Sequence, residues 1–173
     1  MSPFPDSAPS TLPDVTDLKL LSTYMNDHLA GSTVGVELAR RAAGSNEATD
    51  LGGFLSRLAA EIEEDRDALL AMMDRLGVSK DRLKVAAGWA GEKVGRLKPN
   101  NRLFGYSPLS RVIELEGLAL GVEGKRSLWQ ALAGLNEPRL AEFDFDALLE
   151  RARVQRDQLQ ERRLAAALDA FQG

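Results

Sequence analysis

The sequence predicts an all-α protein, and three observations support this prediction. Ala, Leu, Glu and Arg, which are good helix formers, recur through the chain, whereas aromatic residues make up only 6% of it. Apolar residues recur at alternating spacings of three and four over long segments, as in amphipathic helices. Capping or helix-breaking residues bound each of these segments. With 173 residues, 44% of them apolar, the chain is long enough for one domain with a substantial core.

The first two predicted helices form an antiparallel hairpin. The first is expected from a cap at Asp14 or Thr16 to Gly44, and the second from about Asp50 to Leu76. Gly77 then follows at a position where a left-handed residue commonly ends a helix.

The last two predicted helices form a second pair. The third is expected after the cap Ser107 and Pro108 and extends to about Leu135. The tripeptide NEP, residues 136–138, interrupts the chain, and the fourth helix continues from Leu140 or Asp144 to Phe171.

The two pairs predict an antiparallel four-helix bundle with a long crossover between helices two and three. We assign residues 1–13 to a flexible leader and 14–173 to a single domain. The crossover spans 78–108, in which the stretch DRLKVAAGWAGEKVGRLK could form a short helix.

Composition limits the possible partners and compartments. The chain has no cysteine, which excludes disulfides and thiolate metal sites and favours a cytoplasmic location. Residues 1–13 have neither a basic start nor an apolar core, so we expect neither a signal peptide nor a membrane partner. The net charge of -4 disfavours nucleic acid as a partner, although eight basic residues and only two acids lie from Lys80 to Arg111.

The stretch EIEEDRDALL contains five acids, and periodicity indicates which of them faces inward. The second helix carries a seam, meaning a line of inward positions spaced four and three apart. Its members are Leu51, Leu55, Leu58, Ile62, Asp65, Leu69, Met72 and Leu76. Asp65 is the single polar member. Glu63, Glu64 and Asp67 fall on the solvated face, and Glu61 lies at the margin.

Each of the other long helices also contributes an inward polar residue near its middle. The candidate polar residues of the interior are His28, Asp65, Glu114, Lys125 and Gln155. Buried polar groups are costly when unpaired, so we expect them to pair with one another, and Asp65 with Lys125 in particular. The alternatives are a structural layer that fixes helix register and a functional site. In a functional site, His28 and Asp65 could transfer protons or bind one divalent metal weakly.

These segments resemble the ferritin-like superfamily, which includes the bacterioferritins. In LALGVEGKRSLWQAL, Gly121 occupies the position of the third-helix ligand Glu. Counting back from the Leu-Gly that ends RDALLAMMDRLG places Ile62 and Asp65 at the Glu-x-x-His positions of helix two. The stretch ARVQRDQL places Ala152 and Gln155 at those of helix four. In NDHLAGS, His28 occupies the first-helix ligand position. Only His28 and Asp65 could still bind a metal.

The resemblance implies a bundle with a degenerate di-iron site that works as a non-catalytic binding or interaction protein without a cofactor. It also implies a homodimer. The alternative is a metal-dependent or acid/base enzyme that uses His28 and Asp65 with iron or manganese. No catalytic residue is assigned, and the sequence does not identify a small-molecule ligand.

Glycines are unusually frequent inside helices one and three. They are Gly31, Gly35, Gly117, Gly121 and Gly124. Each costs roughly 1 kcal/mol of helix stability relative to Ala. Close helix contact and room for a ligand both explain such positions, and we expect close contact.

Overall fold

The computed structural model describes residues 17–80 and 106–172, and this part of the chain contains four α-helices and no strand. The helices are α1 (Leu18–Ser45), α2 (Asp50–Leu76), α4 (Pro108–Gly134) and α5 (Phe145–Gln172). A 3-10 turn, η1 (Pro138–Leu140), precedes α5. The all-α prediction is therefore confirmed for the described residues. The predicted leader and the predicted short helix of the crossover lie outside them.

Local capping chemistry explains where the helices begin and end. Ser107 caps α4 through a hydrogen bond from Ser110 N, and Gly77 follows α2 with a left-handed φ of 69°, both as predicted. The predicted start of α1 is wrong. Asp17 is the cap, because its carboxylate accepts hydrogen bonds from the backbone of Lys19 and Leu20 at 3.0 and 3.1 Å.

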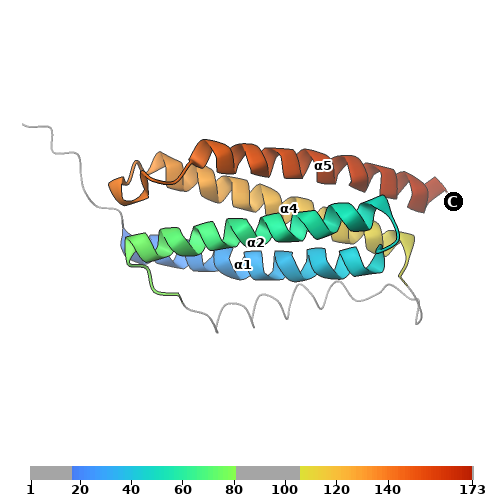
Figure 1. Cartoon of the computed structure of the whole chain (residues 1–173), viewed down its shortest axis with the longest axis horizontal. Coiled ribbons are helices and arrows are strands. Elements are labelled where there is room, and N and C mark those ends of the chain that lie inside the picture. The colour runs from blue at the N-terminus through green and yellow to red at the C-terminus, as the bar shows by residue number, and fades with distance from the viewer. Residues whose placement is uncertain (1–16, 81–105, 173) are drawn as a thin grey trace, which may run out of the picture.

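The four helices form a bundle of two antiparallel pairs. Figure 1 shows α1 beside α2 and α4 beside α5, and α1 also packs against α4. The helices α2 and α4 run in the same direction, so the end of α2 and the start of α4 lie at opposite ends of the bundle.

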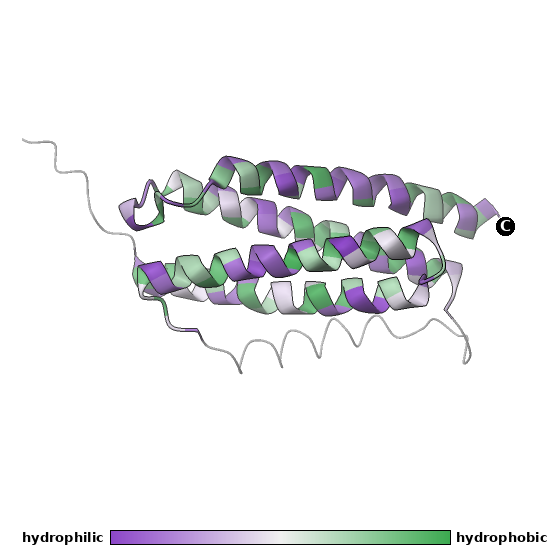
Figure 2. Ribbon diagram, viewed as in Figure 1, coloured by the Kyte–Doolittle hydropathy of each residue, from purple (hydrophilic) through white to green (hydrophobic). Residues whose placement is uncertain are grey.

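Apolar side chains from all four helices form the core. The predicted seam of α2 is buried from Leu55 to Leu76, and Leu51 is partly buried. Figure 2 shows that α5 is the most hydrophilic helix, and it contributes a narrow buried line that includes Leu148, Ala152 and Leu159. No described helix has a stretch apolar and long enough to cross a bilayer.

Candidate functional site

A buried ion pair joins Asp65 of α2 to Lys125 of α4 in the interior of the bundle. The Nζ of Lys125 donates hydrogen bonds to Asp65 Oδ2 and to Gln155 Oε1, the second over 2.5 Å. Asp65 and Gln155 are almost completely buried, and the Lys125 side chain is 13% exposed. We call these three residues, Asp65, Lys125 and Gln155, the polar layer. The predicted contact between Asp65 and Lys125 is confirmed.

Three further residues extend the polar layer towards solvent. Arg151 of α5 donates to Asp65 Oδ1 and, over 2.8 Å, to Glu64. The amide of Gln155 donates to Glu61 over 2.7 Å, so this marginal acid belongs to the network. Arg151 was not among the residues predicted from the sequence. It lies four residues before Gln155 and hence on the same helix face, which is the signal that could have identified it.

The polar layer neutralises its own charges. Burial lowers the pKa of Lys125 below its ordinary value, and the Asp65 carboxylate opposes this shift. Both oxygens of Asp65 already accept hydrogen bonds from cations, so a metal ion there would meet repulsion from Lys125 and Arg151. Within residues 17–80 and 106–172, no three His, Asp or Glu residues are grouped so that they could hold a metal.

His28 does not join the hydrogen bonds of the polar layer. Its ring meets Tyr24 edge-on, with the ring centroids 4.6 Å apart, and its Cε1 lies 4.0 Å from where a Cβ on Gly124 would be. Burial lowers the pKa of His28, and Asp27 partly opposes this shift. The anticipated contact with Asp65 is therefore not formed, because two cationic side chains bind this carboxylate instead.

Glu114 belongs to a separate network rather than to the middle layer. It accepts a hydrogen bond from the Tyr106 hydroxyl over 3.0 Å and lies 3.3 Å from Arg41. The Tyr106 hydroxyl also accepts a hydrogen bond from Asn46, whose Oδ1 binds Arg111. Burial raises the pKa of Tyr106. This network joins the end of α1 to the start of α4, so the assignment of Glu114 to the polar layer is wrong.

A groove of about 550 Å³ lies next to the polar layer. Residues of α1 and α4 form its walls, and residues of α2, including Ile62 and Asp65, form its floor. Most of its lining is apolar. The walls run antiparallel. At the apolar end of the groove Gly117 lies opposite Leu38, and at the more polar end Gly124 lies opposite His28. Lys125 lies at the polar end.

All five helix-interior glycines singled out from the sequence line this groove. A Cβ added to Gly31 or Gly121 would meet no atom within 4 Å, and one on Gly35 would meet Ile62 at 3.8 Å. The closest contact would be at Gly117, whose Cβ would lie 3.4 Å from Leu38, an ordinary van der Waals distance. The expectation of close helix contact is therefore wrong at Gly31 and Gly121, where the missing side chains leave open space.

Trp129 lines the same groove and has an unsatisfied donor. The residue is 1% exposed, and its indole N–H has no hydrogen-bond acceptor among the described residues. Leaving such a donor buried and unpaired costs about 1 to 3 kcal/mol. Trp129 was not among the residues predicted from the sequence, although it follows Lys125 by four residues and therefore shares its helix face.

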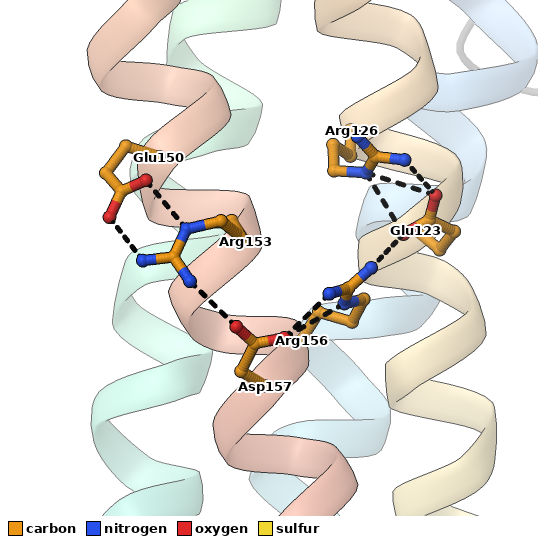
Figure 3. Close-up of polar contacts among 6 residues, drawn as sticks. All are labelled: Glu123, Arg126, Glu150, Arg153, Arg156 and Asp157. Atoms are coloured by element: carbon orange, nitrogen blue, oxygen red, sulfur yellow. Dashed lines mark hydrogen bonds and ion pairs between the residues drawn. The ribbon is translucent and has the colours of Figure 1, made fainter.

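The outer surface of α4 and α5 carries a different kind of polar network. Figure 3 shows Glu123 and Arg126 on α4 linked through Arg156 to Asp157, Arg153 and Glu150 on α5. Hydrogen bonds from the neighbouring arginines lower the pKa of Glu123, Glu150 and Asp157. These side chains lie in water, where ion pairs contribute little to stability. The groove and the buried polar layer are therefore the stronger candidate site.

Comparisons of the chain with protein-family models, curated proteins and solved structures gave no match.

Proposed function

We propose that this protein is a non-catalytic binding protein, a ferritin-like bundle whose degenerate metal centre has been replaced by an internal ion pair. In this proposal the groove between α1 and α4 binds an apolar small molecule. The observation that carries it is the groove itself, which is lined by the helix-interior glycines Gly31 and Gly121, where an added Cβ would meet no atom within 4 Å. Glycine at both positions weakens the helices, and a ligand that needs the space explains that cost.

The polar layer supports binding rather than chemistry. Asp65 is held by Lys125 and Arg151, so it is poorly placed to take a proton from a substrate or to bind a cation. Its internal pairing supplies a neutral floor beneath the apolar groove.

Titration with Nile red, a neutral dye that fluoresces in apolar surroundings, tests this function. We expect saturable binding of one dye per chain. Gly31→Leu and Gly121→Leu should each weaken it at least about tenfold, since each side chain would occupy the groove. Gly44→Leu is the matched control, because Gly44 also lies in a helix and has open space but does not line the groove. Unsaturable binding, or equal binding by all three variants, would contradict the proposal.

Elemental analysis of protein purified without added metal tests the proposed loss of the metal centre. We expect iron, manganese and zinc well below one atom per chain. A near-stoichiometric metal that is lost in the His28→Ala, Asp65→Ala double variant would overturn the proposal and favour the metal enzyme.

A further inference from the structure

His28 offers the groove two ring nitrogens that no described residue binds. In the part of the chain that the structure describes, the buried side-chain nitrogen and oxygen atoms without a hydrogen-bond partner are Trp129 Nε1 and Arg151 Nε. The nitrogens of the half-buried His28 are unpaired and are not among these buried atoms, so they are accessible from outside the protein.

The ring edge that carries both nitrogens points across the groove. Cε1 of His28, which is bonded to Nδ1 and to Nε2, lies 4.0 Å from where a Cβ on Gly124 would be. His28 belongs to the α1 wall of the groove and Gly124 to the α4 wall. The edge-on contact with Tyr24, with the ring centroids 4.6 Å apart, limits rotation of the imidazole. The nitrogens therefore lie at the groove surface, between its two walls.

The neighbouring polar groups of the lining already have partners. The Ser32 hydroxyl donates a hydrogen bond to the Leu29 carbonyl over 2.7 Å, and Lys125 is bound by Asp65. A polar group of a ligand would therefore find its open hydrogen-bond partner at His28.

Open space for an apolar body lies beside His28. Gly31 follows His28 by three residues, so it lies on the same helix face and about 4.5 Å further along the axis. A Cβ on Gly31, or on Gly121 of the facing wall, would meet no atom within 4 Å. An apolar ring system above these glycines would place a substituent on its edge next to the imidazole.

The charges around His28 favour an uncharged substituent. Burial lowers the pKa of His28, and a neutral imidazole has one nitrogen that donates and one that accepts a hydrogen bond. The exposed carboxylate of Asp27 acts on the same ring and would repel a ligand anion. The cation Lys125 is already paired with Asp65. A hydroxyl group therefore matches His28 better than a carboxylate does.

We propose that the ligand is an uncharged apolar molecule with a hydroxyl group, such as a phenol, and that this hydroxyl donates its hydrogen bond to a ring nitrogen of His28. This assignment rests on the proposed function of the groove. It adds the chemical class of the ligand and the residue that recognises its polar group.

Equilibrium dialysis with three fluorescent naphthalenes tests the proposal. The probes are 2-naphthol, its isostere 2-methylnaphthalene, in which a methyl group replaces the hydroxyl, and the anion 2-naphthoate. We expect 2-naphthol to bind at least as tightly as 2-methylnaphthalene, because the hydrogen bond to His28 offsets the cost of taking the hydroxyl out of water. We expect 2-naphthoate to bind more weakly than 2-naphthol.

His28→Phe removes both ring nitrogens and keeps an aromatic ring beside Tyr24. This variant should bind 2-naphthol about tenfold more weakly and change the affinity for 2-methylnaphthalene by less than about twofold. Ser127→Phe is the matched control, because it adds the same side chain at an exposed position of α4 that does not line the groove. It should bind both probes as the unaltered protein does. A His28→Phe variant that weakens both probes equally, or neither, would overturn the role of His28.

The probes also test the inference in the unaltered protein, without any variant. A clear preference for 2-methylnaphthalene over 2-naphthol would overturn the inference and leave an apolar binding groove. Tighter binding of 2-naphthoate would overturn the assignment of an uncharged ligand. Failure of all three probes to bind would contradict both the inference and the function on which it rests.

Discussion

Asp65 is the most buried carboxylate of the acid-rich stretch from Glu61 to Asp67. Its neighbours along the helix face solvent or the margin, whereas Asp65 meets Lys125 and Arg151 inside the bundle. An ion pair in this position contributes mainly by avoiding an uncompensated buried charge. The pair should therefore be strongly coupled.

A double-mutant cycle measures this coupling. Asp65→Ala alone should destabilise by about 3 to 5 kcal/mol, since it leaves Lys125 buried without its carboxylate. Asp65→Ala should reduce the free energy of unfolding by less in a Lys125→Met background than in the unaltered protein. The coupling energy measured by urea unfolding should be about 0.5 to 3 kcal/mol. The exposed pair Arg75–Glu142, 2.7 Å apart, is the control and should couple by less than about 1 kcal/mol. Additive losses at Asp65 and Lys125 would refute the contact.

His28 should make stability depend on pH. Burial holds the pKa of His28 in the folded protein below the ordinary 6.5 of the unfolded chain. At pH values between the folded and unfolded pKa, the unfolded chain therefore binds more protons than the folded protein. The contribution of His28 therefore falls as pH decreases from about 7 through this window. The effect should stay below about 1 kcal/mol, because solvent reaches the half-buried ring. Unfolding free energies of the unaltered protein and of His28→Asn should diverge below pH 6.5, and parallel pH profiles would refute the effect.

At the scale of the helices, the glycines differ in what surrounds them. Those that line the groove from α1 and α4 have space for a side chain, whereas the glycine at the start of α2 has none. Gly121 lies in mid-helix and faces open space, so a methyl group there adds helix propensity without a clash. Gly52 lies in the first turn of α2, where a Cβ would be 2.2 Å from the backbone oxygen of Asn46. Of these two glycines, Gly52 is the one that the close approach of two backbones requires.

Thermal unfolding distinguishes these two roles. Gly121→Ala should stabilise the protein by about 0.5 to 1 kcal/mol. Gly52→Ala should destabilise it by more than about 1 kcal/mol, since the chain between α1 and α2 must shift. A destabilised Gly121→Ala variant would show that the groove closes around this residue in solution.

At the scale of the whole molecule, the end of α5 exposes an apolar face. Leu164, Leu168 and Phe171 follow the helical spacing of four and three and are 50%, 57% and 70% exposed. If the protein is the homodimer predicted from the sequence, we expect this exposed apolar face to lie in the interface.

Sedimentation equilibrium between about 1 and 100 μM tests the homodimer. We expect a dimer that Leu168→Glu shifts towards monomer, because the new charge would be buried in the interface. Leu135→Glu, at an exposed leucine beyond α4, is the control and should leave the dimer unchanged. A monomer throughout this range would contradict the prediction.

The sequence predicted the helices and the inward positions well because both depend on local chemistry. Caps such as Ser107 and a terminal glycine such as Gly77 act within one turn, and the seam of α2 follows from 3.6 residues per turn. The same periodicity identified Asp65, Lys125 and Gln155 as inward residues. Opposite charge made the Asp65–Lys125 contact predictable.

Tertiary structure decided which inward residues meet and where space remains. Helix rotation and spacing place Glu114 with Tyr106 and leave His28 outside the hydrogen bonds around Asp65. The same spacing leaves the glycines of α1 and α4 facing a groove. Sequence periodicity gives the direction of a side chain from its own helix axis, but the distance to the facing helix depends on how the whole bundle packs. For this reason the polar layer could be foreseen from the sequence, whereas the groove and the unpaired N–H of Trp129 could not.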